Sequence, residues 1–337
     1  MNLDNVEFYN AGGIEKVAGL GDIGFMRIPE KVRNCLNDRA RFVAMDSVGC
    51  EVRFVTSSPN VDILVACSRP EFSEQGEIRV FKGNFLFQTF TLEPGRVHNF
   101  RLIPPDSFKA ASHKAINDRG FSSDVWRLAF NRGATFCLHG IDTHGYVIRP
   151  PKKSEKPNLN WLAYGSSITN SSLDGYPHFA ARILRAQVQN KGLSGACQME
   201  KEIVDYMVDG CEWDFATCEL GINMRGGFTP EDFGKRAVYL IDRFAATKKP
   251  VAVIGVFPNC RTSSYTDKPD TSTEREDAYN KILSDLVRRK KAANLHFIAG
   301  EQVLDDFTGL SGDLLHPSGY GHAIMGANLA RILRKII

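Results

Sequence analysis

Four short motifs in the C-terminal half of the chain carry the residue types that nucleophilic catalysis needs. Two hydroxyls stand together in Gly165-Ser166-Ser167, and a carboxylate and an imidazole stand three residues apart in Asp313-Leu314-Leu315-His316-Pro317. Between them, Gly195 and Asn223 lie in two further loops that are rich in glycine and polar residues. A hydroxyl, an imidazole, a carboxylate and fixed hydrogen-bond donors together indicate acyl transfer through a covalent serine ester.

The motifs lie in a region where segments with strand and helix patterns alternate. The expected strands are residues 160–164, 186–190, 215–220, 250–257 and 295–298, and segments of helical period occupy 175–185, 199–208, 230–246, 273–293 and 318–336. Such a series of β–α units predicts a mostly parallel sheet with helices on both faces. Ligands bind beyond the C-terminal ends of such strands, so we expect the motifs to meet at one edge of the sheet.

The motifs resemble the sequence blocks of the SGNH/GDSL hydrolase family, in order, over about residues 160–337. The Gly-Asp-Ser block appears as Gly165-Ser166-Ser167, and the glycine of the second block matches Gly195. The Gly-x-Asn-Asp block matches Gly221-Ile222-Asn223 and then departs from the family with Met224. The Asp-x-x-His-Pro block, residues 313–317, is unchanged. The resemblance implies a three-layer α/β/α hydrolase domain of flavodoxin-like topology.

The resemblance also implies the roles of the site residues. Ser167 is expected to be the nucleophile, His316 the general base and Asp313 the residue that orients it, and the backbone N–H of Ser167 is expected to form the oxyanion hole with Gly195 and Asn223. The three-residue spacing lets Asp313 reach Nδ1–H of His316 and leave Nε2 facing Ser167. An imidazole can accept and return a proton near neutrality. No metal and no organic cofactor is expected.

The sequence leaves other interpretations of these residues open. Ser166, Ser167 and Thr169 could cap the next helix, as serine and threonine often do, and Ser166 or Ser194 could be the nucleophile instead. His322 could compete as the base, although it is expected in the first turns of the last helix. Further residues with two interpretations are Gly195 (oxyanion donor or turn), Asn223 (oxyanion donor or cap) and Arg225 (substrate contact or solvated side chain).

The first 150 residues have a different pattern, in which apolar and polar side chains alternate. Val48, Cys50, Val52 and Phe54 form one such set, and turn signals such as Glu93-Pro94-Gly95 separate the segments. Short alternating strands predict an all-β, jelly-roll-like antiparallel sandwich. A proline-rich charged stretch follows and predicts a linker. We therefore expect a β-sandwich domain at 1–150, a linker at 151–159 and the catalytic domain at 160–337.

One branch of the family, which includes carbohydrate esterases and an acyltransferase-like enzyme, also has an N-terminal sandwich. The resemblance therefore implies a serine esterase that cleaves a small acyl group, such as acetyl, from a carbohydrate or similar alcohol through acyl-Ser167. An acyltransferase that uses the same site is the first alternative, and a non-catalytic carbohydrate-binding protein is a weaker one. The expected partner is a small-molecule or carbohydrate ester.

The composition and charge of the chain exclude several classes of partner. Hydrophobic residues make up 43 % and charged residues 24 %, which is typical of a globular chain. The net charge of +3 is too small to indicate a nucleic-acid or anionic-membrane partner. No apolar run approaches the ~20 residues of a membrane span, and the N-terminus has no signal-peptide pattern. The 8 scattered cysteines indicate reduced thiols, so a cytoplasmic protein is expected. The sequence does not determine the oligomeric state.

Overall fold

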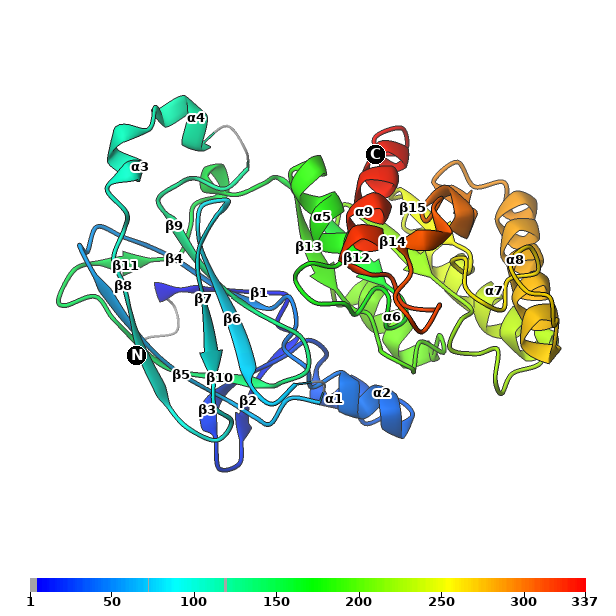
Figure 1. Ribbon diagram of the computed structural model, residues 1–337, viewed down its shortest axis with the longest axis horizontal. Helices are drawn as coiled ribbons and strands as arrows, with labels where there is room; N and C mark the ends of the chain where they lie inside the picture. Colours follow the sequence, from blue (N-terminus) through cyan, green and yellow to red (C-terminus); the bar gives the residue numbers. More distant parts are fainter. Residues whose placement is uncertain (1–4, 72, 118–119) are drawn as a thin grey trace. The chain divides into compact units, whose positions relative to one another are not determined.

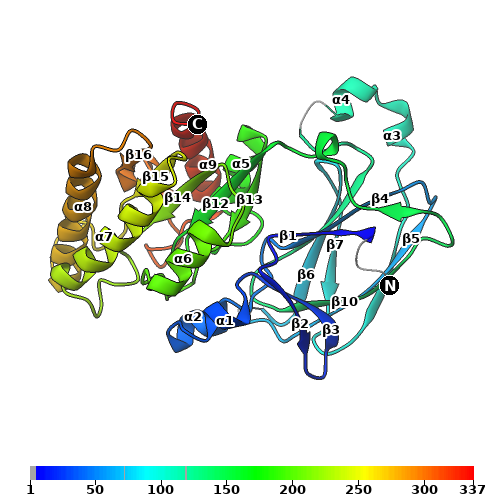
Figure 2. The same cartoon turned by 180° about the vertical axis from the view of Figure 1, so that it is seen from behind.

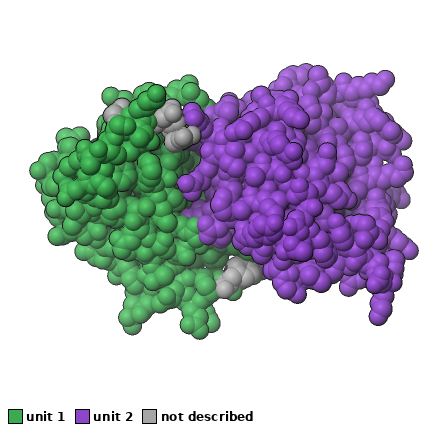
Figure 3. All heavy atoms as spheres, turned by 45° about the horizontal axis from the view of Figure 1, so that its top comes forward, with its two compact units in different colours: residues 1–29, 44–158 green, residues 30–43, 159–337 purple. Residues whose placement is uncertain are grey.

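The computed structural model describes residues 5–71, 73–117 and 120–337. The chain divides into two compact units (Figure 3). One consists of residues 1–29 and 44–158, and the other of residues 30–43 and 159–337. Each unit has its own buried apolar cluster, so each is described separately below.

The first unit is a sandwich of two antiparallel sheets, as the alternating pattern predicts (Figure 1). One sheet has the order β1-β4-β9-β6-β7, with β11 also paired to β4, and the other has the order β2-β3-β10-β5-β8. Its core includes Phe54, Trp126 and Phe136, none of which is exposed. Residues 107–117 contain two short helices. The bounds are β1 Glu7–Tyr9, β2 Gly13–Val17, β3 Gly21–Met26, β4 Glu51–Thr56, β5 Val61–Cys67, β6 Gly76–Lys82, β7 Phe85–Leu92, β8 His98–Leu102, α3 Ser107–Ala110, α4 His113–Asn117, β9 Val125–Phe130, β10 Phe136–Asp142 and β11 Ile148–Arg149.

The second unit contains a five-stranded parallel sheet of order β13-β12-β14-β15-β16. Helix α5 packs beside α9, and α7 packs beside α6 and α8; the two groups cover opposite faces of the sheet (Figures 1 and 2). The predicted three-layer α/β/α fold is confirmed. The bounds are β12 Leu159–Tyr164, α5 Tyr176–Leu184, β13 Ala186–Asn190, α6 Lys201–Asp209, β14 Phe215–Glu219, α7 Pro230–Ala246, β15 Val251–Ile254, α8 Thr271–Lys290, β16 Leu295–Ile298 and α9 Gly319–Leu333.

The strand order decides where the site lies. Numbered along this sheet, the order is 2-1-3-4-5, the doubly wound order in which a crevice opens where the connections reverse direction. That reversal lies between β12 and β14, which pair from Trp161 with Phe215 to Tyr164 with Cys218. The motifs that follow these two strands are therefore neighbours at the carboxyl edge of the sheet.

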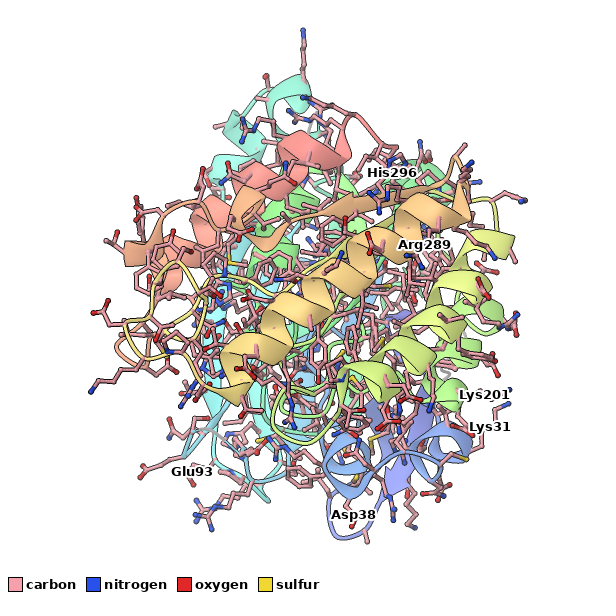
Figure 4. The ribbon with its side chains drawn as sticks, turned by 90° about the vertical axis from the view of Figure 1, so that its right-hand side faces the viewer. Lys31, Asp38, Glu93, Lys201, Arg289 and His296 are labelled. Atoms are coloured by element: carbon pink, nitrogen blue, oxygen red, sulfur yellow. The ribbon has the colours of Figure 1, made fainter. Side chains whose placement is uncertain are left out.

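Two short helices from the N-terminal part of the sequence belong to the second unit. They are α1 (Glu30–Arg33) and α2 (Asp38–Val43), and α1 packs against α6. In Figure 4, Lys31 of α1 and Lys201 of α6 lie side by side at the lower right of the molecule. The apolar side chains of Leu36, Ala40 and Val43 are buried, and their removal from water stabilises the folded position of this segment.

Two further sequence expectations concern the chain as a whole. In the part of the chain that the structure describes, no helix is both long enough and apolar enough to cross a bilayer. All eight cysteines are free thiols, as their scattered positions predict, and five of them are buried.

Candidate active site

Ser167 lies in the turn that directly follows β12. The turn requires glycine at its first position, because a Cβ on Gly165 would lie 2.3 Å from Oγ1 of Thr169 and 2.5 Å from Oε2 of Glu219. No side chain fits at that approach, so the strand can turn sharply only where glycine ends it. Ser167 itself is half-buried, whereas Ser166 next to it has no exposed surface. The Ser167 hydroxyl is therefore the accessible one of the pair.

The structure brings Ser167, His316 and Asp313 into one chain of hydrogen bonds. The distance between Oγ of Ser167 and Nε2 of His316 is 2.8 Å. On the other side of the ring, Nδ1 of His316 lies 2.7 Å from Oδ2 of Asp313. A carboxylate at Nδ1 keeps the proton on that nitrogen, so Nε2 is left to accept the proton of the serine hydroxyl. This is the geometry of an activated serine nucleophile.

Asp313 is held as a carboxylate by its local hydrogen bonds. Its Oδ1 accepts from the backbone N–H groups of Leu315 and His316, at 3.0 and 2.9 Å, and from Oγ of Ser311 at 2.9 Å. Partial burial alone would raise the pKa of Asp313, but the hydrogen bonds from His316, Leu315 and Ser311 outweigh burial and hold the pKa well below its usual range. Asp313 is therefore ionised wherever His316 can act as a base.

The predicted oxyanion residues present three donors that have no hydrogen-bond acceptor among the residues that the structure describes. Oδ1 of Asn223 accepts from the backbone N–H of Cys197 at 3.1 Å, which fixes the amide and turns Nδ2 away from that bond. Within the described residues, the Asn223 Nδ2 group and the backbone N–H groups of Gly195 and Ser167 donate to no protein acceptor. The Asn223–Cys197 bond also ties the two loops together. These donors are available to stabilise negative charge on a carbonyl oxygen.

The alternative nucleophiles and the alternative base all have other hydrogen-bond partners. Oγ of Ser166 accepts from the N–H of Ile168 at 3.2 Å, and Oγ of Ser194 donates to Oδ1 of Asn170 at 2.6 Å. Nδ1 of His322, in the first turn of α9, accepts from the N–H of Tyr176 at 3.3 Å. These contacts are structural, and none of them involves the Ser167–His316 pair.

Arg225 follows Asn223 but is bound away from solvent. Its Nη1 donates to Oδ1 of Asn259 at 3.1 Å and forms an ion pair with Glu276, and only 17 % of its side chain is exposed. Glu276 and Asn259 are both buried and hydrogen-bonded to each other at 3.1 Å. Of the two interpretations of Arg225, the solvated side chain is wrong, because the buried carboxylate of Glu276 holds the guanidinium.

Glu219, which sequence reasoning did not single out, lies directly beneath the nucleophile turn. Its Oε2 accepts from the N–H of Ser166 at 2.6 Å and from Oγ1 of Thr169 at 3.1 Å, and 1 % of the residue is exposed. Burial raises the pKa of Glu219, although the hydrogen bonds from Ser166 and Thr169 oppose the shift. Its sequence signal was a charged residue at the end of an otherwise apolar strand, where an acid needs a specific partner.

No metal site is evident beside these residues. Across residues 5–71, 73–117 and 120–337, no group of three or more histidine, cysteine, aspartate or glutamate side chains is arranged to hold a metal ion. The site as described consists of side chains and backbone groups of the second unit alone.

This chain is similar to one known protein family and to several solved structures. Residues 163–324 match the GDSL-like Lipase/Acylhydrolase family, and no curated protein matches the chain. Similar solved structures include a salicylyl-acyltransferase, SsfX3, from a tetracycline biosynthetic pathway (17 % identity, 98 % of this chain and 95 % of that one, TM-score 0.75). Another is a GDSL-like lipase from Bacteroides ovatus (16 % identity, 98 % of this chain and 95 % of that one, TM-score 0.68). A third is the acetyl xylan esterase Est2A from the rumen bacterium Butyrivibrio proteoclasticus (10 % identity, 85 % of this chain and 90 % of that one, TM-score 0.55). At these identities the likeness shows the fold.

Proposed function

We propose that this chain is a serine esterase with Ser167 as its nucleophile, and the match of residues 163–324 to the GDSL-like Lipase/Acylhydrolase family supports this proposal. The observation that carries the proposal is the chain of hydrogen bonds from Ser167 through His316 to Asp313, at 2.8 and 2.7 Å. The substrate we propose is a small acyl ester, such as an acetyl group on a carbohydrate or similar alcohol. The acetyl xylan esterase with the same fold supports this choice of substrate class.

The proposed reaction has two halves that use the same groups. Oγ of Ser167 attacks the ester carbonyl carbon while Nε2 of His316 takes the hydroxyl proton, and Asp313 stabilises the resulting imidazolium. The donors of Ser167, Gly195 and Asn223 bind the oxyanion. The C–O bond to the alcohol then breaks, and His316 returns the proton to the leaving alcohol. Water attacks the acyl-serine in the same way, which releases the acid and the free enzyme.

An acyltransferase is the second candidate. The fold similarity with the salicylyl-acyltransferase extends over 98 % of this chain and therefore includes both units. In that reaction, an acceptor alcohol replaces water in the second half, and no other catalytic group changes. The difference lies in which nucleophile reaches the acyl-enzyme first.

The test is a panel of p-nitrophenyl esters with acetyl, butyryl and longer acyl groups, together with acetylated sugars, assayed with and without acceptor alcohols. We expect hydrolysis of the short esters, loss of turnover in Ser167→Ala, and substantial retention of turnover in the neighbouring control Ser166→Ala. Accumulation of the new ester in place of free acid would favour the acyltransferase. Labelling of Ser166 or Ser194 by a fluorophosphonate, in place of Ser167, would contradict the assignment of the nucleophile.

A further inference from the structure

Helix α2 brings a cationic side chain to the loop that contains Gly195. Nε of Arg39 donates to the backbone carbonyl oxygen of Ser194 at 3.1 Å. A Cβ built on Gly195 would have Arg39 Nε, at 3.7 Å, as its neighbour within 4 Å. Arg39 itself is half-buried. A residue near the N-terminus of the sequence therefore contacts a loop of the proposed oxyanion hole.

The contact is made to a particular peptide group. The carbonyl of Ser194 and the N–H of Gly195 belong to the same peptide unit, and in a trans peptide these two groups point in opposite directions. Arg39 therefore holds the carbonyl side of this unit, while the N–H side faces away from Arg39. That N–H has no protein acceptor within the described residues.

The rest of the segment fixes Arg39 in this position. Nδ2 of Asn37 donates to Oε1 of Glu200 at 2.5 Å and to Oε1 of Gln198 at 3.4 Å, and Oδ1 of Asn37 accepts from the N–H of Ala40 at 2.9 Å. Asn37 thereby caps the start of α2 and binds the far end of the same loop. The segment is thus tied to this loop at Ser194 and again at Gln198 and Glu200.

From this geometry we infer that Arg39 is a positioning residue for catalysis, acting through the Ser194–Gly195 peptide. A cationic donor on a carbonyl polarises the peptide group, which makes the N–H on its other side a stronger donor. The same bond fixes the direction of that N–H before the oxyanion forms, so no reorganisation is needed during the reaction. The inference rests on the proposed esterase function, and it assigns the positioning role to Arg39 alone among the residues of α2.

The test compares full-length Arg39→Met, which keeps an unbranched apolar stem, with Arg39→Lys, which keeps the charge. The matched control is Arg41→Ala on the same helix, whose guanidinium pairs only with exposed Asp38 at 3.0 Å among the interactions that the structure gives. On p-nitrophenyl acetate we expect kcat of Arg39→Met to fall about tenfold or more, with KM changed by less than about threefold. Arg39→Lys should lie between Arg39→Met and the wild type, and Arg41→Ala should equal the wild type.

Other results would overturn either the positioning role of Arg39 or the proposed function. An unchanged kcat in Arg39→Met, an equal loss in Arg41→Ala, or a loss confined to KM would overturn the positioning role. If Arg39→Met does not fold, as judged by its thermal melt, Arg39→Lys serves as the test of the positioning role. A wild-type kcat together with a reduced melting temperature in Arg39→Lys would then contradict the inference. A wild-type chain that hydrolyses no ester of the panel would instead refute the proposed function, and this inference with it.

Discussion

The proposed oxyanion hole offers the sharpest test of the proposed chemistry, because one of its three expected donors is a side chain. Substitution of Asn223 by alanine removes Nδ2 and leaves the backbone N–H groups of Ser167 and Gly195 in place. Loss of one such donor typically costs about 10²–10³ in kcat, or roughly 3–4 kcal/mol of transition-state stabilisation. Since the ground-state ester carries little charge on its carbonyl oxygen, KM should change little.

The structure also predicts a second effect of the alanine. Oδ1 of Asn223 is the acceptor for the N–H of Cys197, a residue that is 2 % exposed. Removing this acceptor leaves a buried donor unpaired, which typically costs about 1–3 kcal/mol of stability. Asn223→Asp keeps an acceptor for Cys197 but replaces the donor with a carboxylate oxygen. It should therefore retain more stability than the alanine variant while losing at least as much kcat.

The assay measures kcat and KM for p-nitrophenyl acetate with both variants, alongside a thermal melt of each. We expect a low kcat in both variants and a lower melting temperature in Asn223→Ala than in Asn223→Asp. A kcat within about threefold of the wild type in a folded Asn223→Ala chain would refute the role of Asn223 in binding the oxyanion. So would a loss that appears only in KM.

The other predictions address the proton relay, the oxyanion loop and the buried acid. Because the pKa of Asp313 lies well below its usual range, Asp313 should stay ionised as the pH is lowered and should add no proton of its own to the acid limb of kcat/KM. The acid limb should therefore show the uptake of a single proton, and a two-proton acid limb would contradict this. Gly195 has a φ of +71°, so Gly195→Ala should introduce backbone strain of about 1–2 kcal/mol, which lowers the melting temperature, and it should also lower kcat. A melting temperature equal to that of the wild type would contradict this prediction. Burial raises the pKa of Glu219 in the folded state, so the contribution of Glu219 to stability is present at low pH and is lost as pH rises through that pKa. The Glu219→Gln variant is neutral at every pH, so its melting temperature should exceed that of the wild type at about pH 8 and equal it at about pH 4. A difference in melting temperature that does not change with pH would contradict this explanation.

Much of the second unit was predictable because its signals are local. Alternating strand and helix patterns placed each of the five strands within a few residues, and 230–246 matches α7, where Thr229 caps the helix and Pro230 begins it. The Asp313–His316 geometry is local as well. Three residues suffice for Oδ1 to accept the N–H of His316 while Oδ2 meets Nδ1. The division into a sandwich at 1–150, a linker at 151–159 and a catalytic domain at 160–337 stays a prediction.

The contacts that complete the site were decided only in three dimensions. Glu219 meets Ser166 because β14 pairs with β12, and strand order is a property of the whole sheet that no short pattern encodes. Arg39 meets Ser194 across 155 residues, and its helix lies within the part of the sequence that reads as a sandwich. A periodic pattern reports which face of an element is buried, but not which distant element covers that face. The sequence therefore predicted the reacting groups, and the tertiary structure determined which residues hold them in place.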